Sequence, residues 1–217
     1  MSLKNKWVAN ALVRQGCRML KQAITACGKA RSRVTAPSGA GLEWRPGIAS
    51  LWRTQELTRA GLKCCQMELV DGLVTLVRPQ YEAGVRSYIY IHELRGNMEE
   101  IAQTLEAKDA EAKFPEVLPE IAIRQGKWRV QTTRPWRRTK WFEINDERVA
   151  TLHQRILPRH YQNDFTHGGT RALLGYCDVE KDRLSVQPNN EVGWPITLGA
   201  LRSLHITLTE STRATLE

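Results

Sequence analysis

The pattern of apolar and polar positions along the chain is predominantly helical. In the first clear stretch, apolar residues recur at helical spacing from Leu51 to Leu69, and Asp71-Gly72 follows as a stop signal. Pro79 lies inside the second stretch and cannot donate a backbone hydrogen bond. It is therefore expected either to kink the helix or to lie in its first turns. By the same reasoning, helices are expected at residues 51–70, 73–94, 97–110, 114–126, 145–156, 159–176 and 194–208.

Strand-like alternation is nearly absent, with a hint of it only in residues 128–133. The sequence therefore predicts an all-α fold, a single bundle of about five to seven helices. The chain has 217 residues, of which 41% are hydrophobic and 25% charged, enough to bury a sizeable core. No apolar stretch reaches the length of about eighteen residues that a membrane-spanning helix needs, so none is expected.

The cysteines do not follow the spacing of a metal site or a disulfide framework. Their number is 5, and no C-x-x-C pair is followed by a second pair or by histidines. The adjacent Cys64 and Cys65 are expected to provide small apolar side chains and one exposed thiol. A reducing, cytoplasmic location is the natural expectation, with no metal and no cofactor.

Positive charge is concentrated at the start of the chain. The formal net charge is +9, but residues 1–42 hold eight Lys or Arg residues and no acid, which leaves residues 43–217 nearly neutral. Residues 3–27 predict a loosely amphipathic helix, and a linker rich in Ser, Gly and Pro follows. We therefore expect residues 1–50 to form a basic extension and residues 51–217 to form the bundle domain. The extension fits a targeting segment, an arm for nucleic acid or an anionic surface, or a start codon assigned too far upstream.

One polar group lies on the second predicted helix. Arg78, Glu82 and Arg86 are spaced four residues apart, so Glu82 can reach both guanidinium groups on one helix face. Such a group either binds a carboxylate or phosphate or, as a structural ion pair, fixes the register of the helices.

A second polar group surrounds His167, which precedes Gly168-Gly169. Asn163 lies one turn before His167 and Arg171 one turn after it. Imidazole transfers protons well at neutral pH, and the two glycines allow backbone to approach closely. His167 is therefore either a catalytic acid–base or a structural histidine.

A third feature is the acid-free segment 127–141, in which arginines alternate with tryptophans. Such a composition suits base stacking and phosphate contact, and it equally suits a loop whose tryptophans pack inward while its cations face water. With Arg171, the candidate contacts to nucleic acid are Arg129, Arg134, Trp136, Arg137 and Arg138. The chain has no glycine-rich phosphate loop, nucleophile elbow or H-E-x-x-H helix, which argues against kinases, NAD enzymes and zinc hydrolases.

Two of these segments resemble the signatures of an uncharacterised bacterial family of small helical proteins. Residues 76–86 match L-x-R-P-x-x-E-x-x-x-R, and residues 160–169 match an asparagine followed by an aromatic residue and T-H-G-G. The resemblance covers roughly residues 51–210. More distantly, the chain is similar to HEPN and abortive-infection proteins, whose ribonucleases are metal-independent homodimers with an R-x(4–6)-H motif. At five residues before His167 this chain has Gln162 in place of that arginine.

The resemblance implies an HEPN-like protein of a defence or toxin system that cleaves or binds RNA. A polar site built from Arg78, Glu82, Asn163 and His167 would act on the 2′-hydroxyl and phosphate. The alternative is a non-catalytic helical module that binds nucleic acid or a protein. Whether the protein is an enzyme stays open at this point.

Overall fold

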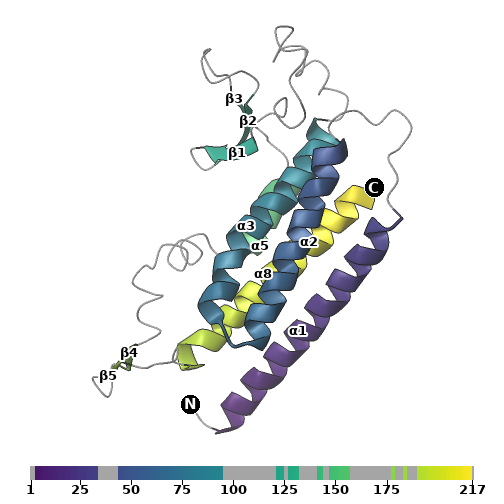
Figure 1. The fold of residues 1–217 in the computed structure, drawn as a ribbon. Helices are drawn as coiled ribbons and strands as arrows, with labels where there is room; N and C mark the ends of the chain where they lie inside the picture. The colour runs from purple at the N-terminus through teal and green to yellow at the C-terminus, as the bar shows by residue number, and fades with distance from the viewer. Residues whose placement is uncertain are drawn as a thin grey trace, which may run out of the picture.

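The computed structural model describes the bundle helices and several short segments that lie between them in the chain. The described residues are 3–33, 44–94, 121–124, 127–131, 141–143, 147–156, 177–178, 183–184 and 190–216. Four long helices lie side by side, and two small groups of strands lie at opposite ends of the bundle (Figure 1). The predicted all-α helical bundle is confirmed.

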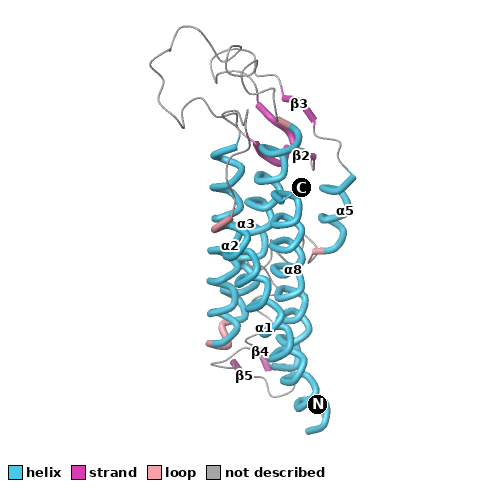
Figure 2. Tube along the Cα trace, turned by 90° about the vertical axis from the view of Figure 1, so that its right-hand side faces the viewer, coloured by secondary structure: helices cyan, strands magenta, loops and turns pink. Residues whose placement is uncertain are grey.

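The long helices are α1 (Leu3–Arg31), α2 (Trp44–Gln66), α3 (Val70–Tyr88) and α8 (Asn190–Leu216). A shorter helix, α5 (Glu147–Arg155), packs beside α8 (Figure 2). Helix α3 continues as the π-helical turn η1 (Ile89–Glu93), where the Leu94 amide donates to the Ile89 carbonyl over 3.0 Å.

The turn between α2 and α3 comes earlier than the sequence predicts. Glu68 has a left-handed backbone conformation with φ of 59°, and the Leu69 amide donates to the Cys64 carbonyl over 2.8 Å. Because the chain reverses there, Asp71-Gly72 lies in the first turn of α3 and does not end a helix. The Asp71 carboxylate suits this position because it faces the positive end of the helix dipole.

Other helix predictions have mixed outcomes. Helix α5 confirms the one predicted at residues 145–156, and α8 begins four residues before Trp194 with Pro195 inside it. The helices predicted at residues 97–110 and 159–176 lie outside the described residues.

Three short strands form an antiparallel sheet in the order β1 (Ile121–Arg124), β2 (Lys127–Gln131) and β3 (Trp141–Glu143). The strand suggested at residues 128–133 is thus confirmed over most of its length. The helical prediction for residues 114–126 is wrong at residues 121–124, which form a strand that pairs with β2 and places Ile121 and Ile123 on the same face. A second pair, β4 (Cys177–Asp178) and β5 (Arg183–Leu184), is antiparallel as well.

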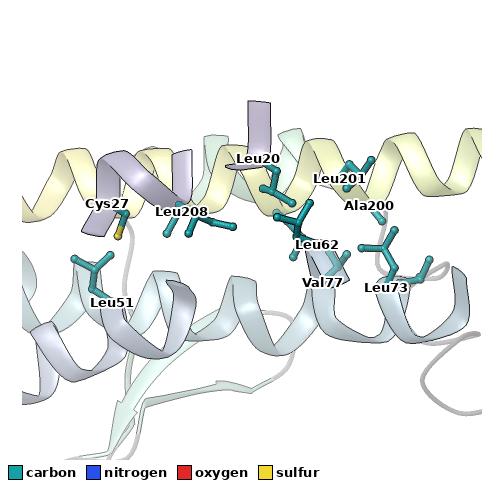
Figure 3. Close-up of a cluster of buried hydrophobic side chains, with 12 residues drawn as sticks. Leu20, Cys27, Leu51, Leu62, Leu73, Val77, Ala200, Leu201 and Leu208 are labelled. Carbon is teal, nitrogen blue, oxygen red and sulfur yellow. The ribbon is translucent and has the colours of Figure 1, made fainter. Parts of the chain in front are cut away.

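The central core forms where the four long helices meet (Figure 3). Leu20, Leu73 and Leu204 come from three different helices, and no part of them is exposed. A second cluster joins the end of α3 to the sheet and to α5. Its members include Tyr81, Ile89, Ile121, Trp128, Val149 and Leu152. The sheet and α5 are therefore fastened to the bundle through a core of their own.

Helix α1 is a structural part of the bundle. Leu20, Ile24 and Cys27 belong to the same core as residues of α2, α3 and α8, and the Gln55 side-chain amide donates to the Ile24 carbonyl over 3.0 Å. Helix α2 also begins at Trp44, so the division predicted at residue 50 falls within a helix. The packing thus differs from an extension that stands apart from a domain of residues 51–217.

Candidate functional site

The polar group predicted on α3 forms as expected. Glu82 accepts hydrogen bonds from both arginines, from Arg78 Nε over 3.0 Å and from Arg86 Nη2 over 3.3 Å. The three side chains are 30%, 22% and 37% exposed in sequence order, so the group is only partly shielded from water. The single helix places them together because residues four apart lie on one face.

Arg86 also connects this group to the sheet. Its Nε donates to the Ile121 carbonyl in β1 over 3.1 Å, so Arg86 bridges α3 and a strand 35 residues away. Glu82 thus orients Arg86, whose guanidinium also joins α3 to the sheet. These contacts favour the interpretation of the group as a structural ion pair, and Arg78 faces Glu82 rather than an open anion site.

Replacing Glu82 with glutamine should lower the free energy of unfolding by about 1 kcal/mol, because Arg78 and Arg86 lose their shared counter-charge at partly exposed positions. Urea denaturation of Glu82→Gln measures this loss. Glu56→Gln is the matched control, because Glu56 pairs with Arg59 at a site where both side chains are about half exposed. The control should change stability by less than about 0.5 kcal/mol; equal losses in both variants would remove any special role for Glu82.

The tryptophan at the start of the basic segment packs inward. Trp128 is 6% exposed, and its indole N–H donates to the Tyr81 hydroxyl over 3.3 Å. The centroids of the two rings are 6.0 Å apart, and the rings pack edge to face. Burial raises the pKa of the Tyr81 hydroxyl. For Trp128, the structure therefore favours core packing over base stacking. Arg129 lies beside it in β2, partly buried and opposite Glu143 of β3.

Most of the other predicted site residues lie outside the described residues. The structure describes Arg78 and Glu82 of the proposed catalytic set and Arg129 of the proposed contacts to nucleic acid. The predicted site residues outside the described ranges are Asn163, His167, Arg134, Trp136, Arg137, Arg138 and Arg171.

Four of the eight basic residues predicted in the N-terminal extension gather on one side of α1, at the edge of the bundle (Figure 1). The side of α1 that packs on the bundle is a seam with spacings of three and four residues. The seam residues are Val13, Cys17, Leu20, Ile24 and Cys27. At 100° per residue, four exposed cations cluster in an arc of about 80°, centred about 120° from the seam. We call this the basic face; its residues are Arg14, Arg18, Lys21 and Lys29.

Nothing on α1 neutralises the basic face, because residues 1–42 contain no acid. Within the described parts of the chain, none of its four cations forms an ion pair. Trp7 lies in line with them on the helix and is 73% exposed. Arg31, in contrast, is turned toward α2, where its guanidinium stacks over Trp52 at 4.1 Å. The sequence signal for the basic face is the spacing of the seam residues by three and four. This spacing marks the side of α1 that packs inward, and so the side on which its cations are exposed.

A cleft of about 230 Å³ lies between α3, α5 and α8. Its lining includes apolar Val85 and Leu152 and a charged group in which Glu210 pairs with Arg155 at 3.0 Å and Arg213 at 2.7 Å. The described lining contains no histidine or cysteine. The cleft has room for a small molecule, but both of its described arginines are already paired with Glu210.

In the described ranges, no group of three or more His, Cys, Asp or Glu side chains is placed to hold a metal ion. None of the described helices has the length and apolar character needed to cross a membrane. Among the described surfaces, the basic face of α1 is the one on which several exposed charges of one sign gather without an acid on the same helix. Comparisons with protein-family models, curated proteins and solved structures gave no match for this chain.

Proposed function

We propose that the protein binds RNA through the basic face of α1. The observation that carries the proposal is the division of this helix into two sides. One side packs into the central core through Leu20 and Ile24, and the other presents four cations with no acid nearby on the helix. A helix held rigidly on its inner side can present its outer cations at fixed spacing.

The dimensions and residue types suit a nucleic-acid strand. Arg14 and Lys29 are separated by about 22 Å along the helix axis, a length comparable to about six nucleotides of one strand. Lysine and arginine neutralise phosphates, and an exposed aromatic ring such as Trp7 provides a surface on which an unpaired base stacks. The overall charge of +9 adds a favourable long-range field.

Fluorescence anisotropy with a labelled single-stranded RNA tests the proposal. Replacing Arg14, Arg18, Lys21 and Lys29 with glutamine should weaken binding by at least about tenfold, because up to four phosphate contacts are lost. A matched control removes the same charge from exposed positions on α2 and α8. The control replaces Arg45, Arg53, Lys63 and Arg202 with glutamine and should bind within about twofold of wild type.

Two outcomes would contradict the proposal. Equal loss of affinity in both variants would assign binding to net charge rather than to the basic face. Binding to vesicles rich in anionic phospholipid, together with no binding to RNA, would assign the same face to a membrane surface, since cations on an exposed helix face also attract anionic lipids.

The same incubation tests for cleavage, which the resemblance to HEPN ribonucleases implies. Shortening of the RNA without added metal, abolished in His167→Ala, would extend the proposal from binding to catalysis. Intact RNA with both proteins would restrict the function to binding.

A further inference from the structure

Three thiols lie where α1 crosses the last turns of α2. The sulfur atoms of Cys17 and Cys65 are 3.2 Å apart, although the two residues are 48 positions apart in the sequence. Both side chains are partly buried and pack against the central core. The third thiol, Cys64, lies against α3, with its sulfur 3.2 Å from the point where a Cβ on Gly72 would lie.

We propose that Cys17 and Cys65 are a reversible redox pair that forms a disulfide between α1 and α2. The two sulfurs need to approach by only about 1.2 Å to reach bonding distance, a shift within the reach of side-chain rotation. Cys65 is the expected partner because its sulfur is the one in contact with Cys17, whereas the side chain of the adjacent Cys64 points about 100° away around the helix. The proposal does not depend on RNA binding.

Hydrogen peroxide is a sufficient oxidant for this reaction. One cysteine thiolate attacks the peroxide O–O bond, giving a sulfenic acid and releasing water after proton transfer. The second thiol then displaces the sulfenic oxygen as another water, which leaves the S–S bond. In total, two thiols lose two electrons and two protons, and one hydrogen peroxide is reduced to two waters.

Burial and the neighbouring Cys17 thiol raise the pKa of Cys65 to about 12. Thiolate at Cys65 is therefore scarce at neutral pH, and disulfide formation should accelerate as the pH rises from about 7 to 9. Once formed, the bond closes a long loop and restricts the unfolded chain. The oxidised protein should therefore melt about 5–10 °C higher than the reduced protein.

Peroxide treatment of the full chain, followed by alkylation and tryptic mass spectrometry, tests the pairing. Wild type and Cys64→Ser should each yield the peptide of residues 15–18 linked to the peptide that begins at residue 64. This linkage should be absent from Cys17→Ser and Cys65→Ser. Circular dichroism of the reduced variants checks that each remains folded, since serine is close to cysteine in size.

Three results would overturn the proposal. One is a linkage to Cys17 that persists in Cys65→Ser and disappears in Cys64→Ser. Another is complete alkylation of Cys17 and Cys65 after oxidation that modifies other thiols. The third is a linkage that forms only between separate molecules, detected as a dimer on non-reducing gels.

Discussion

Replacing Leu20 with alanine is expected to lower the free energy of unfolding by about 3 kcal/mol. Leu20 lies on α1 and has no exposed surface, and it packs among leucines of α2, α3 and α8. Truncation removes buried methyl groups and leaves a cavity that neighbouring helices fill only in part. Chemical denaturation followed by circular dichroism measures the change.

Met19→Ala is the matched control for Leu20→Ala. Met19 is the preceding residue on the same helix, and it is 45% exposed. Its truncation should change stability by less than about 0.5 kcal/mol. Similar small effects for both variants would show that α1 does not contribute to the core, and residues 1–50 would then be an extension as the sequence alone suggests.

Replacing Gly84 with alanine is expected to destabilise the protein by about 2 kcal/mol, although alanine favours helices. A Cβ on Gly84 would lie 2.5 Å from Ser211 Oγ and 2.7 Å from Thr207 Cγ2 of α8. Either α3 and α8 must separate or these side chains must move. The loss, measured by urea denaturation, therefore reports how closely the two helices approach.

A double-mutant cycle distinguishes this clash from a general effect of changing Gly84. The buried Ser211 hydroxyl has no hydrogen-bond partner among the described residues, so Ser211→Ala should be nearly neutral alone. Combined with Gly84→Ala, it should recover about 1 kcal/mol by removing the nearest clashing atom. Strictly additive effects would contradict the close approach at this crossing.

Much of the fold was predictable because helical periodicity is a local property. The apolar stripes of α2, α3 and α8 are long and regular, and their positions were predicted to within several residues. Their ends were less predictable, since the left-handed conformation of Glu68 has no signal as clear as a glycine. The packing of α1 is less evident from the sequence, because two of the five residues of its seam, Cys17 and Cys27, have small side chains.

The candidate site was predictable only where it lies on one helix. The pairing of Glu82 with Arg78 and Arg86 follows from their spacing alone. The bond from Trp128 to Tyr81 joins residues 47 positions apart, and no local pattern specifies such a contact. The basic face required both kinds of information, because its cations are visible in the sequence but its exposure depends on which side of α1 packs inward.

The salt dependence of RNA affinity tests the central claim, that the basic face of α1 binds RNA, most directly. Each phosphate neutralised on a single strand contributes about −0.7 to the slope of log affinity against log salt concentration. Replacing Arg14, Arg18, Lys21 and Lys29 with glutamine should therefore make the slope shallower by about 3, whereas the control variant on α2 and α8 should keep the wild-type slope. Parallel salt dependences for wild type and the basic-face variant would contradict the claim.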